Sequence, residues 1–265
     1  MKTISYPSLI EVIKPILEVK ATLNSDTLTI DEWRKNYLDN IKTERAKSKI
    51  QIFNIFASAL LERQMRGETY SKRIQLMNSR LNEYKDITPD MIKGILKEVG
   101  YRWVDKGVEV VLELKRLTEN DFVWENYFKK AEANFLSNFM DDPFLKIRFV
   151  GIKVRDFALS EFSSYYLAND LHIVKLIKRT GLLLDGYGDY DFGTNQFDEK
   201  EYLFLKRLII KLAKESGWED GAGFSPGEID KIFWNFGRTI CKPEPLCSEC
   251  PIKDICLTGK NRRET

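Results

Sequence analysis

The sequence predicts an all-α protein, and three observations support this fold class. Apolar residues recur at helical spacing along most of the chain, as at Ile52, Ile55, Phe56, Ala59 and Leu60. Signals for helix starts are strong, whereas the alternating runs that are typical of strands are nearly absent. The sequence also lacks internal repeats and low-complexity segments. We therefore expect helices joined by loops.

Helix starts are clearest where a capping side chain precedes a proline. Thr88-Pro89, Asp142-Pro143 and Ser225-Pro226 each place proline at the first helical position. Glu228 completes a capping box with Ser225. Between Phe122 and Met140, aromatic residues recur at helical spacing, which favours a buried core over a surface on which bases stack.

The composition is that of a globular chain with a substantial core, because 43% of its 265 residues are hydrophobic. No apolar run is long enough to span a bilayer and no signal-peptide pattern is present, so we expect a cytoplasmic, prokaryotic protein without membrane association. The net charge is only +2, so a nucleic-acid surface would need local clustering of Lys and Arg. A single histidine, His172, excludes a metal site built from several histidines.

The four cysteines lie in one short segment with the spacing C-x5-C-x2-C-x5-C, as Cys241, Cys247, Cys250 and Cys256. Disulfides are not expected without a secretion signal. Four thiols so close in sequence predict one metal site, and the chemistry of thiolate ligation fits either zinc or an iron–sulfur cluster. We expect a structural role, because metal-binding energy becomes folding energy for a loop with little core of its own.

The segment from Asp142 to Leu182 predicts three helices. A short helix leads to a tight hairpin at Phe149-Val150-Gly151, a second helix begins at Ile152-Lys153, and a third begins at Asn169-Asp170. We expect Gly151 to have a positive φ or to lie close to neighbouring backbone. The amine of Lys153 and the carboxylate of Asp170 would then lie at neighbouring helix starts. The helix dipole and partial burial would both favour the neutral form of Lys153.

This segment resembles the helix-hairpin-helix DNA glycosylases of the endonuclease III superfamily. Val150-Gly151-Ile152-Lys153 is similar to the end of the family's Leu-Pro-Gly-(Val/Ile)-Gly-x-Lys hairpin, although Arg148-Phe149 stands where the family has Pro-Gly. Residues 169–181 are similar to the helix that follows, with its Val-Asp-x-His start. The cysteine loop resembles the family's loop around a four-iron, four-sulfur (4Fe-4S) cluster, with a first interval one residue shorter, and this favours iron–sulfur over zinc.

The resemblance implies a two-lobed, all-α helix-hairpin-helix DNA glycosylase fold with a C-terminal iron–sulfur cluster loop (241–256). One lobe would be a helical bundle of residues 50–166. The other would join residues 167–265 to residues 1–49, which predict two or three short helices and carry no motif. DNA would lie between the lobes of a monomer, which would be associated with the nucleoid when bound.

The implied activity is that of a base excision repair enzyme on double-stranded DNA. The chain would flip out a damaged base, cleave its N-glycosidic bond and nick the abasic site by β-elimination as an AP lyase. Lys153 would attack C1′, and Asp170 would stabilise the positive charge on the sugar. The resemblance implies that the DNA-binding positions are Gln64, which would fill the gap left by the flipped base, Arg66, Phe149, Val150, Gly151 and His172. We expect His172 to orient or pack rather than to act as a base.

Two alternatives remain at this stage. One is a monofunctional glycosylase that uses water instead of Lys153, and the other is a DNA-binding protein that keeps the fold without catalysis. The sequence does not identify the base that is excised. The glycine-rich and acidic loop from Leu182 to Asp198 is expected to shape the base pocket rather than to contact phosphates.

Overall fold

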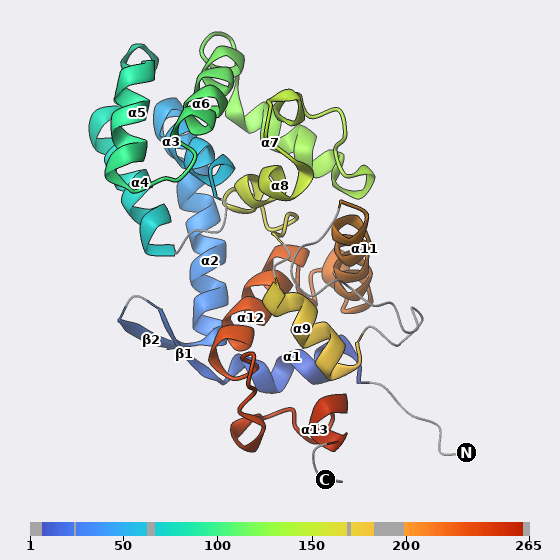
Figure 1. The fold of residues 1–265 in the computed structure, drawn as a ribbon. Helices are drawn as coiled ribbons and strands as arrows, with labels where there is room; N and C mark the ends of the chain where they lie inside the picture. The colour runs from blue at the N-terminus through green and yellow to red at the C-terminus, as the bar shows by residue number, and fades with distance from the viewer. Residues whose placement is uncertain (1–6, 24, 63–66, 169–170, 183–198, 262–265) are drawn as a thin grey trace. The chain divides into compact units, whose positions relative to one another are not determined.

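The computed structural model describes residues 7–23, 25–62, 67–168, 171–182 and 199–261. Helices dominate these residues, which confirms the predicted class, and Figure 1 also shows a short pair of strands. None of the helices in these ranges combines the length and the apolar character needed to cross a bilayer. Three site residues predicted from the sequence, Gln64, Arg66 and Asp170, lie outside the described residues, as does the loop of residues 183–198.

The chain divides into two compact units, one of residues 40–168 and one of residues 1–39 with 169–265. Residues 40–49 belong to the 40–168 unit, whereas they were predicted to join the lobe that contains residues 167–265. The reason is that α2 (Ile30–Arg45) continues past the division. Its last residue, Arg45, forms ion pairs with Glu125 at 3.0 Å and with Glu132 at 2.8 Å, both in the 40–168 unit.

The 40–168 unit is built around α3 (Lys49–Leu60), in which every residue from Ile52 onward is buried. A helix that is apolar all round belongs at the centre of a bundle, and α3 packs against α4, α6 and α8. Ser48 and Gln51 form a capping box that fixes where α3 begins. The other elements are α4 (Gly67–Arg80), the 3₁₀ helix η1 (Tyr84–Asp86), α5 (Pro89–Glu98), α6 (Val104–Thr118), α7 (Trp124–Ala133), the 3₁₀ helices η2 (Phe135–Ser137) and η3 (Pro143–Lys146), and α8 (Ile152–Ser160).

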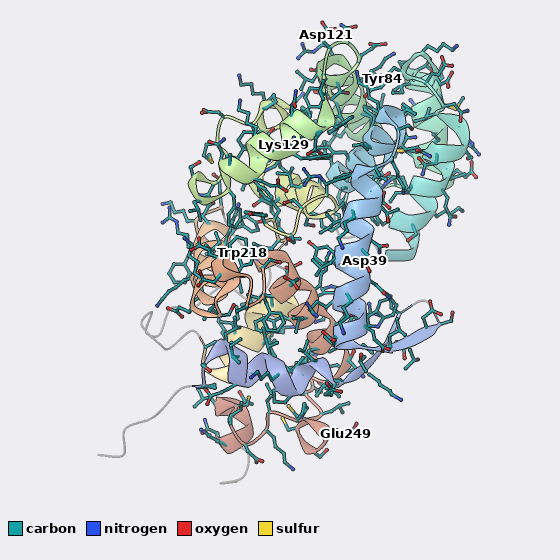
Figure 2. All side chains as sticks on the ribbon, turned by 180° about the vertical axis from the view of Figure 1, so that it is seen from behind. Asp39, Tyr84, Asp121, Lys129, Trp218 and Glu249 are labelled. Atoms are coloured by element: carbon teal, nitrogen blue, oxygen red, sulfur yellow. The ribbon has the colours of Figure 1, made fainter. Side chains whose placement is uncertain are left out.

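The aromatic residues of α7 and its surroundings form the core of this unit, as their spacing predicted. The Phe56 ring of α3 lies 5.1 Å from the rings of Trp124 and Phe144, measured between centroids. Phe128 is stacked on Phe162 at 4.7 Å. On the outer side of the same segment Lys129 is exposed, and it is labelled in Figure 2.

The second unit is built around α12 (Pro226–Thr239), which packs against α1, β1, α9 and α11. The predicted capping box is confirmed, since Glu228 N donates to Ser225 Oγ at 3.4 Å and the Glu228 carboxylate accepts from Ser225 N at 2.9 Å. Arg34 Nη1 donates to the same carboxylate at 2.6 Å. The other elements are α1 (Leu9–Leu17), β1 (Lys20–Leu23), β2 (Asp26–Thr29), α9 (Leu171–Thr180), α11 (Glu199–Glu215), the 3₁₀ helices η4 (Trp218–Asp220) and η5 (Cys247–Glu249), and α13 (Leu257–Asn261).

The β-hairpin near the N-terminus corrects the expectation of helices alone in residues 1–49. β1 and β2 pair antiparallel, from Lys20 opposite Thr29 to Leu23 opposite Asp26. Each strand has four residues, too few for an alternating pattern to be recognised in the sequence. Tertiary contact supports the hairpin, because Trp33 of α2 donates its indole N–H to Ala21 O at 2.9 Å.

Candidate nucleic-acid interface and cysteine loop

The predicted hairpin is present between η3 and α8. Val150 N donates to Ile147 O at 3.1 Å, which closes a four-residue turn. Phe149, the third residue of this turn, has φ +70°, the left-handed conformation that a type II turn requires at that position and that glycine normally supplies. Gly151 has φ −99°, and a Cβ added there would meet nothing within 4 Å. The expectation for Gly151 was therefore wrong, because Phe149 adopts the left-handed conformation instead.

Lys153 lies in the first turn of α8, which begins directly after its N-cap, Gly151. This agrees with the predicted helix start. The residue is exposed, so the partial burial expected for it is wrong. The buried residues of this part of α8 are Ile152, Arg155 and Asp156, which lie on the inner side of the helix.

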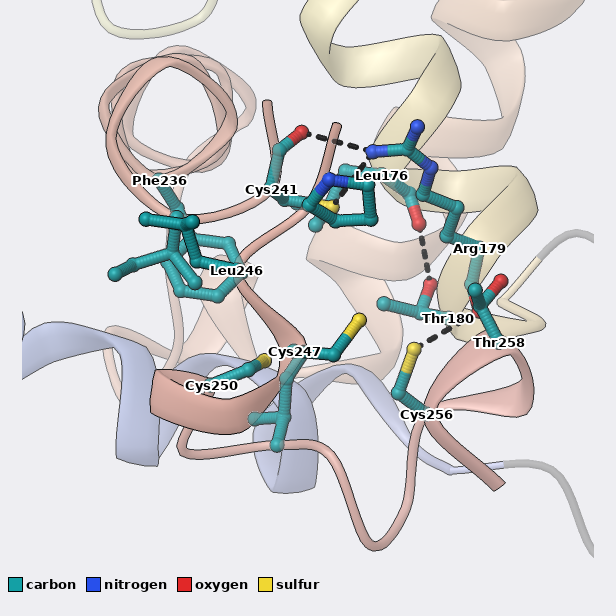
Figure 3. Close-up of a pocket in the computed structure, with 13 residues that line it drawn as sticks. Leu176, Arg179, Thr180, Phe236, Cys241, Leu246, Cys247, Cys250, Cys256 and Thr258 are labelled. Atoms are coloured by element: carbon teal, nitrogen blue, oxygen red, sulfur yellow. Dashed lines mark hydrogen bonds between the residues drawn. The ribbon is translucent and has the colours of Figure 1, made fainter. Parts of the chain in front are cut away.

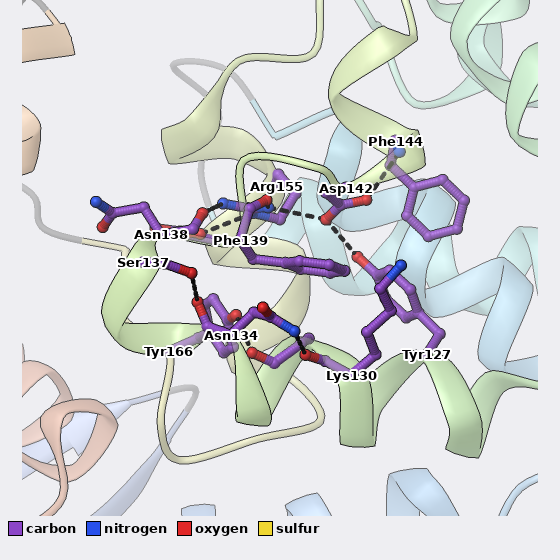
Figure 4. A network of polar contacts seen from close by, with 12 residues as sticks. Tyr127, Lys130, Asn134, Ser137, Asn138, Phe139, Asp142, Phe144, Arg155 and Tyr166 are labelled. Atoms are coloured by element: carbon purple, nitrogen blue, oxygen red, sulfur yellow. Dashed lines mark hydrogen bonds and ion pairs between the residues drawn. The ribbon is translucent and has the colours of Figure 1, made fainter.

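A buried network of polar side chains connects α8 to the segment before the hairpin (Figure 4). Arg155 has no exposed side-chain surface, and it donates Nη1 to Asp142 Oδ2 and Nε to Asp156 Oδ1, both at 2.8 Å. Asp142 Oδ2 also accepts from Tyr127 Oη at 2.8 Å. Asp142 Oδ1 accepts from Phe144 N at 2.8 Å, which caps η3 as the Asp142-Pro143 sequence predicted.

The guanidinium of Arg155 also binds the loop that precedes η3. Its Nη2 donates to Asn138 O at 2.7 Å and its Nη1 to Phe139 O at 2.9 Å. Both loop residues have positive φ, +63° and +45°. Burial alone would lower the pKa of Arg155, but Asp156 and Asp142 outweigh it and raise that pKa above its usual value. Arg155 therefore holds together the two segments from which the hairpin projects. This role was not predicted, because an arginine that will be buried cannot be told from a surface arginine by its sequence position.

The start of α6 lies beside the hairpin. Lys106 Nζ is 5.1 Å from the centroid of the Phe149 ring. One residue later, a Cβ at Gly107 would lie 2.7 Å from Leu96 and 3.3 Å from Leu61, so glycine permits a close approach here. The end of α3 therefore lies next to α6, since Leu61 directly follows α3. Sequence reasoning did not single out Lys106.

His172 lies in the first turn of α9 and is close to α12. A Cβ at Gly237 would be only 2.8 Å from the His172 Cβ, so the two helices can pack at this distance only because position 237 has no side chain. His172 is half-buried in this contact. The structure therefore places it between two helices of its own unit.

The four cysteines line one pocket, which is drawn in Figure 3. All four are free thiols; Cys241 and Cys256 are buried and Cys247 and Cys250 are partly exposed. The rest of the lining is largely apolar and includes Leu176, Phe236, Leu246 and Ile252. Burial raises the pKa of Cys250 to about 11 and also raises the pKa of Cys241, although Arg179 opposes the shift at Cys241.

The donor set of this pocket is four thiols, which suits either a zinc ion or an iron–sulfur cluster. A zinc ion with Zn–S bonds of about 2.3 Å would hold its four sulfurs roughly 3.8 Å apart. Across the ranges that the structure describes, no three His, Cys, Asp or Glu side chains are gathered in the way that a single metal ion requires. In a 4Fe-4S cluster each thiolate binds a different iron, so its sulfurs lie farther apart around a larger volume.

Comparisons with known proteins give solved structures only, since neither a family model nor a curated protein matches the chain. An 8-oxoguanine DNA glycosylase from Methanocaldococcus jannaschii is similar with a TM-score of 0.58 and 17% identity, over 79% of this chain and 88% of that one. The M. jannaschii 8-oxoguanine glycosylase/lyase in complex with DNA containing 8-oxoguanine is similar with a TM-score of 0.60 and 16% identity, over 87% of this chain and 97% of that one. The Thermotoga maritima 8-oxoguanine DNA glycosylase is similar with a TM-score of 0.53 and 19% identity, over 77% of this chain and 92% of that one.

The chain has the fold of a helix-hairpin-helix DNA glycosylase. Within this glycosylase fold, the hairpin and Lys153 belong to the 40–168 unit and the cysteine loop to the other. The facing arrangement of Lys153 and Asp170 stays a prediction, because Asp170 is outside the described residues.

Arg179, in the last turn of α9, connects the glycosylase fold to its cysteine loop. Its Nη1 donates to Cys241 O at 3.0 Å and to Lys242 O, and its Nη2 donates to Pro243 O at 2.7 Å. In return, Cys256 Sγ donates to Arg179 O at 3.0 Å. One side chain thus satisfies three carbonyl groups of a segment that has little secondary structure. The sequence analysis matched residues 169–181 to the family but did not assign this role.

Replacing Arg179 by methionine should destabilise the second unit by about 2 kcal/mol, because a charged donor is lost and three carbonyl acceptors lose their partner. Thermal unfolding of the full chain checks the size of the effect, and hydrogen exchange locates it in residues 241–246. Lys175→Met, one turn earlier on α9, is the matched control and should change stability by less than about 0.5 kcal/mol. Equal stability of the two variants would contradict a structural role for Arg179.

Proposed function

We propose that the chain is a DNA glycosylase of base excision repair with an associated AP lyase activity. The observation that carries this proposal is the glycosylase fold in which Lys153 occupies the first turn of the helix after the hairpin. One of the similar structures is a glycosylase/lyase solved with DNA that contains 8-oxoguanine. DNA as the partner of this chain follows from the same likeness.

The proposed chemistry requires an amine and a carboxylate at the everted nucleotide. The base leaves with the electrons of its bond to C1′, and the carboxylate of Asp170 stabilises the positive charge that develops on the sugar. The Lys153 amine forms a bond to C1′, loses a proton and opens the ring to a Schiff base. Loss of a proton from C2′ then expels the 3′ phosphate, which nicks the strand.

The substrate that we test first is an oxidised purine, because the similar structures are 8-oxoguanine glycosylases. The wild-type chain is incubated with duplexes that contain 8-oxoguanine, an oxidised pyrimidine, uracil or an alkylated purine, with and without borohydride. We expect base release from at least one duplex, together with a borohydride-trapped protein–DNA adduct. Binding to all duplexes without release from any would contradict the proposal and favour a non-catalytic DNA-binding protein.

A monofunctional glycosylase is the second candidate, and the exposure of Lys153 favours it. Contact with water stabilises the charged form of an amine, which cannot attack C1′, so an exposed position favours the neutral form less than a buried one does. In this case water would be the nucleophile, and Asp170 would orient it. The outcome that identifies this candidate is release of the base without a trapped adduct.

We further propose that the cysteine loop holds a 4Fe-4S cluster, as the endonuclease III resemblance implied. The four thiols that line one largely apolar pocket support it. Cys241, Cys247, Cys250 and Cys256 would be the ligands. The cluster would supply folding energy to residues 241–261 rather than take part in base release.

Replacing Cys250 by serine should therefore remove the visible absorbance of the purified protein and lower its melting temperature. We expect a loss on the order of 4 kcal/mol, or about 10 °C, because cluster binding and folding of the loop are coupled. Ser248→Ala is the matched control, since Ser248 is an exposed residue of the same short segment. Iron and acid-labile sulfide are measured in both proteins. Zinc in place of iron in the control would contradict the proposal.

A further inference from the structure

The starting observation is the conformation of Phe149. Its φ of +70° is rare for any residue other than glycine and is strained for a side chain of this size. Such a conformation persists only where its surroundings enforce it. Here the Arg155–Asp142 pair fixes both segments from which the hairpin projects. The hairpin therefore presents an aromatic ring at the position where a glycine would form the same turn without strain.

The ring lies among cations. Arg148 Cζ is 4.7 Å from its centroid and Lys106 Nζ is 5.1 Å away, and both cationic residues are exposed. Phe149 itself is half-buried, so part of the ring remains accessible. Two acidic residues are nearby. Glu109 Oε1 is 3.7 Å from Arg148 Nη1, and Asp105 Oδ1 is 3.3 Å from Lys93 Nζ. Both are surface ion pairs, which hold their partners weakly.

A partly accessible ring beside two exposed cations suits one class of ligand. A nucleobase stacks on an aromatic face whatever its sequence, and the phosphates on either side of it bind Lys and Arg. A base within an intact duplex has both faces covered by its neighbours and cannot stack on protein. The matching ligand is therefore an unpaired nucleotide.

We propose that Phe149 is a stacking platform for an unpaired nucleobase of DNA, with Arg148 and Lys106 binding the flanking phosphates. The proposal rests on the proposed DNA function and deepens it, because it assigns to the hairpin a specific side-chain contact with DNA. It predicts a preference for DNA with a locally unpaired strand. Such DNA exposes a base at no further cost in unstacking.

The test measures binding of three Phe149 variants to a fully paired duplex, to the same duplex with a three-nucleotide bulge and to single-stranded DNA. Phe149→Leu and Phe149→Gly should each bind the bulged and single-stranded DNA about tenfold more weakly, since one base–aromatic stack is worth roughly 1–3 kcal/mol. Binding to the paired duplex should change by less than about twofold. Phe149→Trp should bind like the wild type, and its fluorescence should be quenched by bulged DNA more than that of the wild type.

The glycine variant adopts the left-handed turn without strain, so it separates loss of the ring from loss of the hairpin. Tyr165→Leu is the matched control, because Tyr165 is an aromatic residue of the same unit with 39% of its surface exposed. Equal weakening on all three DNAs, or none on any, would overturn the proposal. If the wild type releases a damaged base while the Phe149 variants bind bulged DNA normally, only this inference fails. If the wild type releases no base but the Phe149 dependence is observed, only the enzymatic proposal fails.

Discussion

Replacing Lys153 by glutamine should abolish the borohydride-trapped adduct on abasic-site DNA, because the amide cannot form a Schiff base. Strand nicking should disappear with the adduct. Binding of the same DNA should change by less than about threefold, since one exposed charge among several makes a modest contribution to phosphate binding. Denaturing electrophoresis of the trapped complex and of the nicked strand measures both effects.

The matched control is Lys146→Gln, an exposed lysine at the end of η3 on the other side of the hairpin. Lys146→Gln should form the borohydride-trapped adduct as well as the wild type does. Adduct formation that survives in Lys153→Gln would show that another amine is the nucleophile.

Asp170→Asn should slow base release by about 10²–10⁴-fold, because it removes the charge that stabilises the sugar cation.

Replacing Arg155 by methionine should destabilise the 40–168 unit by about 3–5 kcal/mol. The substitution leaves two buried carboxylates, Asp142 and Asp156, without their cation, and an uncompensated buried charge is the costly outcome of breaking such a pair. It also removes the donor to the carbonyls of Asn138 and Phe139. Denaturation followed by circular dichroism measures the loss, and hydrogen exchange should show it in α7, η3 and α8.

Arg116→Met provides the control for removing an arginine. Arg116 forms an ion pair with Glu113 at 2.9 Å, but 67% of its side chain is exposed. A surface pair of this kind contributes about 0–1 kcal/mol. The loss of stability in Arg155→Lys should lie between those of Arg155→Met and Arg116→Met. Lysine keeps the charge but lacks the planar guanidinium that binds several oxygens. A loss below about 1 kcal/mol for Arg155→Met would contradict the role assigned to the network.

The features that sequence reasoning identified are those set by neighbouring residues. The capping box at Ser225 and the proline starts after Thr88, Asp142 and Ser225 appear as predicted, because a cap depends on residues within one turn. The aromatic core around Trp124 was likewise indicated by spacing alone.

The features that it missed depend on residues far apart in sequence or on an unusual conformation. Arg155 reaches an acceptor thirteen positions earlier, and Arg179 reaches carbonyls more than sixty positions later. The left-handed conformation was assigned to Gly151 because glycine is its usual carrier, whereas surrounding contacts impose it on Phe149. Close helix packing at Gly237 also depends on a residue, His172, that is distant in sequence.

α9 is held at both ends by the C-terminal part of the chain. Near one end of α9, His172 packs against α12 at Gly237. At the other end, Arg179 donates hydrogen bonds to carbonyl groups of residues 241–243. A helix held at both ends in this way moves as a rigid body, so a displacement of the cysteine loop would be carried to its first turn. The first turn of α9 therefore depends for its position on the cysteine loop as well as on α12.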